Sequence, residues 1–285
     1  MPKKKSYIFI LLLIFCICIG ITVKKYKDNI AQYVASFIVD KNDKFFDSKK
    51  QVLTKERESI KYKHLTIFYL KSDLELLPET KSALERAIQL NENLFDINDN
   101  QPSEIIIFKN MDEIESLSKM EYANGFYSER GKLIGIVPEI KEGEIDLWNY
   151  KKTLMHEYTH DVFWQKVDGL GLTYEDFPYW FLEGIAEYVG YDDLDIDIKI
   201  SNIHTPFVPL KQLTTYKQWN QYRINSDYNV YLQSYVVIKF LVHEYGNEII
   251  NKILIETKYK GVFEAGLESA TGININTLEG HVKDF

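Results

Sequence analysis

The order of apolar and polar residues divides the chain into short segments typical of strands and longer segments typical of helices. Short apolar runs at residues 64–70 and 104–108 predict two strands, and the amphipathic segment 74–95 between them predicts a helix. Residues 126–140 predict a hairpin that turns near residue 130. We therefore expect a small β-sheet in this part of the chain.

The rest of the chain shows the helical period. Helical patterns occur at residues 147–166, 177–189, 229–246, 247–256 and 262–270. Pro178 and Gly190 bracket the second of these segments, because proline suits the start of a helix and glycine its end. The apolar residues of 147–166 form one stripe, which we expect to face the core: Leu154, Met155, Tyr158 and Val162.

Two histidines four residues apart lie on the other side of this helix. His156 and His160 are separated by ~40° in azimuth and ~6 Å along the axis, so both imidazoles can reach one ion. Glu157 is turned by one residue and is placed to contact a water on that ion. This H-E-x-x-H pattern predicts a zinc site, with Glu157 as the general base.

The next helix supplies a third candidate ligand. Residues 177–189 are mostly apolar or aromatic, yet they carry Glu183 and Glu187 one turn apart. A buried carboxylate needs a partner such as a metal ion or a histidine. We expect Glu183 to be the third zinc ligand and Glu187 to accept a hydrogen bond from a ligating histidine. With a different helix register, Glu187 would replace Glu183 as the ligand.

Other interpretations of these residues exist. The two histidines could lie on an exposed helix face without a metal, and the two glutamates could form an exposed strip. A structural zinc site would need a fourth protein ligand, for which only His204 and His243 are available nearby.

The pair HEYTH and WFLEGIAEY resembles the gluzincin peptidases, in particular the bacterial peptidase-MA-like group. The resemblance covers residues 64 to the C-terminus and implies an α+β, zincin-like fold with a small mixed sheet and a helical C-terminal lobe. It implies that His156, His160 and Glu183 bind one zinc ion and that Glu157 is the catalytic base. It further implies that the second strand of the predicted hairpin is the sheet edge that holds an extended peptide.

A segment near residue 231 resembles the family's tyrosine-containing segment before a helix that ends in tyrosine and glycine. This resemblance favours Tyr231, and next Tyr235, as the hydrogen-bond donor to the oxyanion. The family signature G-x-M-E-N for a substrate amine is absent, which favours an endopeptidase over an aminopeptidase.

The N-terminal residues predict either an uncleaved membrane anchor or a signal peptide, and the anchor is favoured. An apolar run at residues 7–23 is flanked by lysines on both sides and is followed by no small-x-small cleavage site. We expect an anchor at residues 1–28, a helical juxtamembrane stalk at 29–63 and a metallopeptidase domain at 64–285. The N-terminal lysines favour an inside N-terminus, so the single-pass protein would expose its catalytic domain outside the cell.

Composition narrows the partners and cofactors. A formal charge of −8 and a pI near 5.4 argue against a nucleic-acid surface. Both cysteines lie in the apolar run, so the predicted outer domain has neither a disulfide nor a cysteine metal site. We expect a membrane-anchored zinc peptidase with a peptide or protein substrate. The alternative is a cell-surface binding or sensory domain that keeps the fold without turnover.

Overall fold

The protein is described by a computed structural model that covers residues 45–98, 101–118, 123–192 and 205–285. The chain divides into two compact units, Met1–Leu53 and Thr54–Phe285. Residues 45–55 are helical, and the second unit, Thr54–Phe285, contains every other element described below.

The second unit begins with a five-stranded mixed sheet, whose order is β1-β2-β3-β5-β4. The strands are β1 (Glu58–Tyr62), β2 (Leu65–Tyr69), β3 (Ser103–Ile107), β4 (Gly125–Ser128) and β5 (Leu133–Ile136). The β2, β3 and β5 strands are parallel, whereas the two edge strands, β1 and β4, run antiparallel to their neighbours. The mixed sheet and the helices that follow confirm the predicted α+β class.

Two details of the sheet differ from the sequence prediction. The predicted hairpin forms from β4 and β5. The prediction that its second strand is the sheet edge is wrong, because β5 also pairs with β3 and is internal. The edge strand is β4. The helical interpretation of residues 29–63 is wrong at its end, because β1 begins at Glu58 and pairs with β2. The β1 strand has a weak alternation of apolar and polar residues, because most of its side chains are exposed and none is buried. The sequence pattern therefore did not indicate a strand here.

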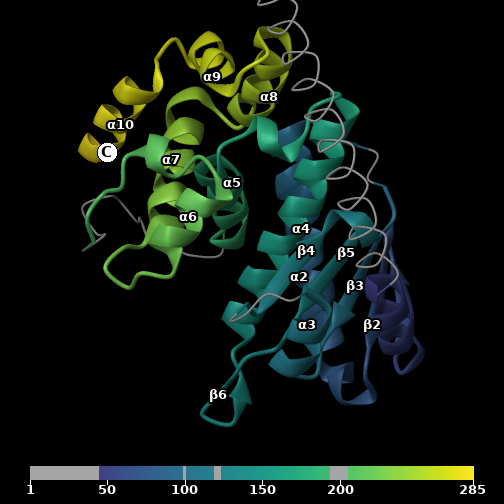
Figure 1. Ribbon diagram of the computed structural model, residues 1–285. Helices are drawn as coiled ribbons and strands as arrows, with labels where there is room; N and C mark the ends of the chain where they lie inside the picture. Colours follow the sequence, from purple (N-terminus) through teal and green to yellow (C-terminus); the bar gives the residue numbers. More distant parts are fainter. Residues whose placement is uncertain (1–44, 99–100, 119–122, 193–204) are drawn as a thin grey trace, which may run out of the picture. The chain divides into compact units, whose positions relative to one another are not determined.

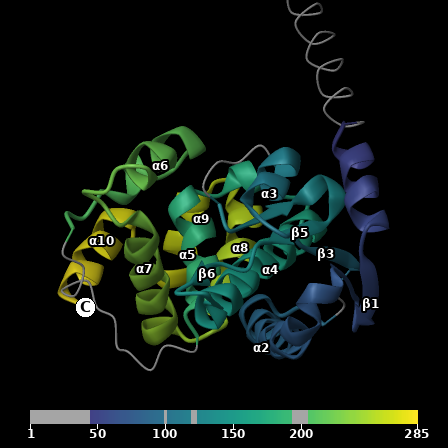
Figure 2. The same cartoon turned by 90° about the horizontal axis from the view of Figure 1, so that it is seen from below.

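Two long helices connect the sheet to the rest of the unit. The α2 helix (Leu77–Phe95) follows a 3₁₀ turn, η1 (Lys71–Leu76), and packs on α4 (Leu147–Gly169). Asp146 caps α4 by accepting a hydrogen bond from the backbone N–H of Asn149. The α4 helix also packs on β4, β5 and α5, so it lies between the sheet and the C-terminal helices (Figures 1 and 2).

The remaining elements are short or follow α4. Before α4 lie α3 (Met111–Ser118), η2 (Glu129–Gly131) and a two-stranded hairpin of β6 (Ile140–Lys141) and β7 (Glu144–Ile145). After α4 come η3 (Tyr174–Asp176), α5 (Tyr179–Gly190), η5 (Leu210–Gln212), α6 (Tyr216–Arg223), α7 (Val230–Tyr245), α8 (Ile249–Lys260), α9 (Phe263–Thr271) and α10 (Ile275–Asp284). The predicted helices at 229–246, 247–256 and 262–270 are confirmed as α7, α8 and α9.

The predicted apolar stripe of α4 is buried, but so is the other side of this helix. Every residue from Leu154 to Phe163 is shielded from solvent. Covered by the sheet, by α2 and by α5, α4 is a central helix rather than an amphipathic surface helix. The polar residues of the H-E-x-x-H motif therefore need partners inside the protein.

No helix in the described ranges is long and apolar enough to cross a membrane. The predicted anchor at residues 7–23 lies outside the described residues.

Gly184 allows α5 and α7 to approach closely. A Cβ atom at this position would lie 2.7 Å from the carbonyl oxygen of Ser234 and 2.8 Å from Cγ1 of Ile238. The contact between α5 and α7 thus leaves no room for a residue larger than glycine at position 184. This contact fixes the position of α5, which carries Glu183 and Glu187.

We expect Gly184→Ala to lower the free energy of unfolding by about 1–3 kcal/mol, because the added methyl group overpacks the contact with α7. Gly280→Ala is the matched control, since no atom lies within 4 Å of its Cβ position on α10. This control should be neutral or slightly stabilising, as alanine favours the helix. Urea unfolding followed by circular dichroism measures both changes, and equal stability of the two variants would contradict the packing argument.

Candidate metal centre

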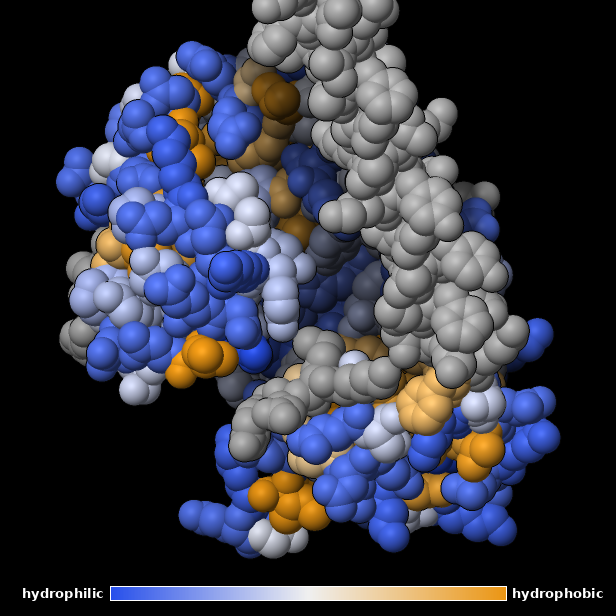
Figure 3. Space-filling view, in the orientation of Figure 1, coloured by the Kyte–Doolittle hydropathy of each residue, from blue (hydrophilic) through white to orange (hydrophobic). Residues whose placement is uncertain are grey.

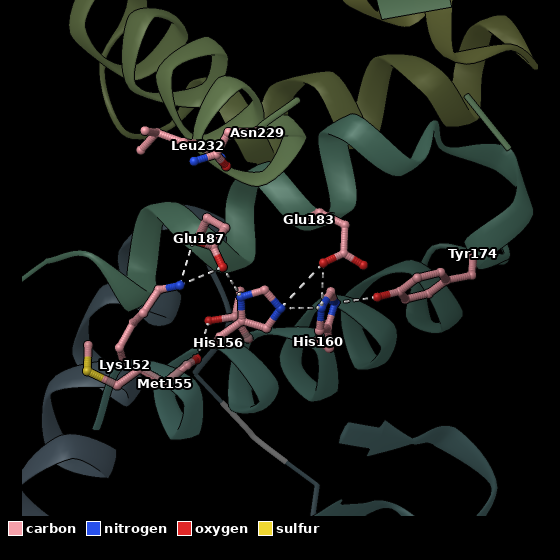
Figure 4. A network of polar contacts seen from close by, with 10 residues as sticks. Lys152, Met155, His156, His160, Tyr174, Glu183, Glu187, Asn229 and Leu232 are labelled. Carbon is pink, nitrogen blue, oxygen red and sulfur yellow. Dashed lines mark hydrogen bonds and ion pairs between the residues drawn. The ribbon is translucent and has the colours of Figure 1, made fainter. Parts of the chain in front are cut away.

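Three potential ligand atoms meet between α4 and α5. Nε2 of His156 lies 3.1 Å from Nε2 of His160 and 3.4 Å from Oε2 of Glu183, and the third separation, from His160 to Glu183, is 3.8 Å. Figure 4 shows the three side chains pointing toward one another from the two helices. Within the described part of the chain, they are the group of histidine, cysteine and carboxylate side chains that could hold a metal ion.

These separations suit a tetrahedral zinc ion. Two ligands bound at ~2.1 Å in tetrahedral directions lie ~3.4 Å apart. The three measured separations, 3.1, 3.4 and 3.8 Å, lie around this value. Two imidazoles and one carboxylate are also a common donor set of catalytic zinc sites, which leave a fourth position open. The residues present therefore fit a zinc ion.

A second carboxylate holds His156 from the other side of its ring. Oε1 of Glu187 lies 3.0 Å from Nδ1 of His156, so this carboxylate can accept the second ring N–H. Lys152 Nζ lies 2.8 Å from Oε2 of Glu187 and 4.4 Å from the centre of the Tyr191 ring. Glu187 therefore lies beside His156 and Lys152, whereas Glu183 faces the Nε2 atoms of both histidines.

His160 has a different partner, which the sequence did not indicate. The Tyr174 hydroxyl lies within hydrogen-bond distance of Nδ1 of His160 (Figure 4). Tyr174 belongs to η3, in the connection between α4 and α5, and burial raises the pKa of its hydroxyl. No motif or helical spacing relates it to His160, so only the folded connection brings the two side chains together.

Glu157 lies beside the edge strand of the sheet. A Cβ atom at Gly125, the first residue of β4, would lie 2.9 Å from Cγ and 3.1 Å from Oε1 of Glu157. Glycine at this position therefore lets the backbone of β4 approach the carboxylate. Burial raises the pKa of Glu157, while the neighbouring His156 and His160 oppose that rise.

The charges of the cluster favour a cation. Burial lowers the pKa of His156, but hydrogen bonds with Glu183 and Glu187 outweigh burial and raise it to about 10. Conversely, burial would raise the pKa of Glu183, but the two histidines lower it below its ordinary value. The carboxylates that favour a proton on His156 would equally stabilise a metal cation at the same place.

A cavity of about 640 Å³ opens on this cluster. Figure 3 shows a hollow between the helices α5 to α7 and the sheet, with a mainly hydrophilic visible floor. His156, Glu157, His160 and Glu183 all line the cavity. Elements on both of its sides contribute walls: residues 123–127 at the β4 edge, and Tyr179, Tyr216, Trp219, Arg223 and Tyr231 on the helices.

The two candidate tyrosines of α7 have different places. Tyr231 lines the cavity, and its ring centre is 6.4 Å from that of His156. Tyr235 packs between Tyr188 and Tyr191 and is not part of the cavity wall. The structure thus brings Tyr231, and not Tyr235, to the candidate metal site.

The other histidines do not complete a four-ligand site in the described residues. His243 is exposed and contacts Glu244, away from the cavity wall. His204 lies outside the described residues.

Comparison with known proteins identifies the family. The family model of the peptidase MA superfamily matches residues 83–285, a range that contains every residue of the cluster. The chain belongs to the peptidase MA superfamily. This member of the superfamily is also similar to a protein of Bacillus subtilis strain 168 that is described as uncharacterized protein YhcO. The two sequences are 37% identical over 241 residues, which cover 83% of this chain and 73% of the relative.

The ion pair between Lys152 and Glu187 generates a prediction about stability. We expect Lys152→Gln to lower the free energy of unfolding of the metal-free protein by about 1–3 kcal/mol, because it removes one of the two cationic partners of the buried Glu187 carboxylate and leaves only His156. Chemical denaturation in the presence of a chelator measures this change.

Lys141→Gln is the matched control, since the Lys141 side chain is 59% exposed and its ion pair with Asp146 lies at the surface. A much smaller loss of stability is expected there. Equal losses in the two variants would show that Lys152 does not stabilise a buried carboxylate.

Proposed function

We propose that this member of the superfamily is a zinc-dependent peptidase, most simply an endopeptidase. The observation that carries the proposal is the arrangement of His156, His160 and Glu183 around one point, with Glu157 beside them at the floor of an open cavity. A structural zinc site is normally closed by four protein ligands, whereas these three ligands leave a fourth position open toward the cavity. Glu157 lies where it could contact a water in that position.

The edge strand supports a peptide as the substrate. Of the described strands, β4 pairs with β5 alone, and residues 123–127 line the cavity next to Glu157. An extended peptide can pair its main chain with such an edge, which binds many sequences without contacting their side chains. We assign this binding edge to β4.

The residues take the following roles in this proposal. His156, His160 and Glu183 hold the zinc ion, which would supply a Lewis acid for the scissile carbonyl and lower the pKa of a water. Glu157 accepts a proton from the attacking water and passes it to the leaving amine. Tyr231, whose pKa is raised by burial and which therefore keeps its proton, donates a hydrogen bond to the oxyanion.

The neighbours of the histidines hold their rings in place. Glu187 accepts the Nδ1–H of His156, and Lys152 keeps this carboxylate charged and oriented. The Tyr174 oxygen accepts the Nδ1–H of His160. We also propose that residues 7–23 anchor the protein in the cell membrane with its catalytic domain outside the cell, which rests on the sequence pattern alone.

Replacement of the proposed base tests the function. We expect Glu157→Gln to bind one zinc ion per chain, as the parent protein does, and to cleave an unfolded protein substrate at least about a hundredfold more slowly. Metal analysis and the appearance of new amino termini measure the two properties. His243→Gln, at an exposed position, is the control and should cleave like the parent.

Two results would contradict the proposal. Zinc bound by the parent without any cleavage of unfolded proteins would favour the binding or sensory domain. Unchanged cleavage by Glu157→Gln would remove Glu157 from its role as the base.

The hydrogen bond between Tyr174 and His160 predicts a change in metal affinity. We expect Tyr174→Phe to weaken zinc binding by about 10–100-fold, because the ring of His160 loses the partner that fixes its orientation. Competition with a chromophoric chelator measures the dissociation constant. Tyr259→Phe, at an exposed tyrosine, should leave the constant unchanged, and an equal constant for Tyr174→Phe would exclude this role.

A further inference from the structure

Arg223 is a cationic side chain of the cavity wall, and no acidic side chain in the described part of the chain forms an ion pair with it. It is the last residue of α6 and is half-buried. Nε and Nη2 both donate to Oδ1 of Asn220, one turn earlier, at 3.1 and 3.0 Å. These two hydrogen bonds fix the position of the guanidinium group in the cavity wall.

The guanidinium keeps unused hydrogen-bonding capacity. An arginine has five N–H donors, and Asn220 accepts from two of them. None of the ion pairs among the described residues includes Arg223. Lys152, the other lysine or arginine in the described part of the wall, is already paired with Glu187. Arg223 can therefore receive an anionic group of a ligand without breaking an ion pair.

Its place relative to the metal cluster is defined by Tyr231. Trp219, one turn before Arg223 on α6, packs against Tyr231 with ring centres 5.1 Å apart, so this turn of α6 lies beside Tyr231. The Tyr231 ring also contacts the His156 side of the cluster. A ligand group on Arg223 would therefore lie on the His156 side of the cavity.

The opposite side of the cavity has the opposite charge. Tyr174 contacts His160 there, and the next residue, Glu175, lines the cavity together with Glu129. Burial raises the pKa of Glu129, and the negative charge of Glu175 raises it further. A ligand carboxylate would be repelled on the Glu175 side and attracted on the Arg223 side. This difference in charge would favour one orientation of a bound peptide.

Aromatic side chains lie beside Arg223 on α6 and α7. Trp219 is buried on α6, one turn before Arg223, and it packs edge-on against the largely buried Tyr231 of α7. Such neighbours limit water around a bound anion and so strengthen its hydrogen bonds with a guanidinium.

We propose that Arg223 binds a carboxylate of the peptide substrate, close to the scissile bond on the His156 side of the cavity. This inference rests on the proposed peptidase function. Two sources share the required chemistry: the C-terminal carboxylate of the peptide and the side chain of an aspartate or glutamate.

Binding to a catalytically disabled protein tests the site separately from turnover. The zinc-loaded full chain carrying Glu157→Gln is titrated with tetrapeptides labelled at their N-terminus, and fluorescence anisotropy gives each dissociation constant. One pair differs only in a free or amidated C-terminus. A second pair is amidated and differs only in aspartate or asparagine at the last position.

We expect at least one carboxylate peptide to bind about tenfold or more tightly than its neutral counterpart. A preference within the first pair identifies the C-terminus as the source, and one within the second pair identifies an acidic side chain. Arg223→Gln should abolish the preference, Arg223→Lys should keep part of it, and Lys217→Gln on the exposed side of α6 should keep all of it. Equal zinc content of the variants verifies that the site is intact.

Equal or undetectable binding of acidic and neutral peptides overturns the proposal, as does a preference that survives Arg223→Gln. If the parent protein still cleaves unfolded substrates in that case, the peptidase function stands and only the carboxylate site fails. If the preference appears but the parent cleaves nothing, the carboxylate site stands and the peptidase function fails.

Discussion

Two carboxylates and two imidazoles meet between α4 and α5, where all four side chains are largely shielded from water. Burying charged groups is costly unless each has a partner, and the two helices supply these partners to one another. Glu183 faces both Nε2 atoms, whereas Glu187 is shared by His156 and Lys152. The relative position of α4 and α5 is therefore tied to the chemistry of the cluster, and a divalent cation would complete its charge balance.

Small residues bring the surrounding elements within reach of this cluster. Gly184 lets α7 pack closely on α5, and α7 carries Tyr231. Gly125 lets the edge strand β4 pass beside the Glu157 carboxylate. The base, the proposed oxyanion donor and the proposed peptide-binding edge thus converge because two positions without a side chain permit close contact. This geometry links the packing of the fold to the proposed reaction.

The sequence predicted the parts of the site that depend on local periodicity. His156 and His160 share a helix face by their spacing, and Glu183 and Glu187 are one turn apart for the same reason, so both pairs were expected before their tertiary contacts were known. The α+β class and most central strands and helices were likewise visible in their apolar patterns. Edge strand β1 was missed because its side chains are mostly exposed.

Features that depend on tertiary contacts were not predictable in this way. The order of β4 and β5 in the sheet depends on which strand pairs with β3, and an apolar pattern does not encode that choice. Tyr174 and Arg223 reach the cavity from a connection and from the end of a short helix, with no spacing that relates them to the histidines. Their roles follow from the folded arrangement of separate segments.

X-ray absorption spectroscopy of the zinc-loaded protein identifies the ligands of the proposed site. We expect one zinc ion per chain, bound by two imidazole nitrogens and by oxygen ligands at ~2.0–2.2 Å, with loss of an oxygen ligand or of the metal in Glu183→Gln. A site with three or more imidazoles, an unchanged spectrum in Glu183→Gln, or a folded protein that binds no zinc would contradict it.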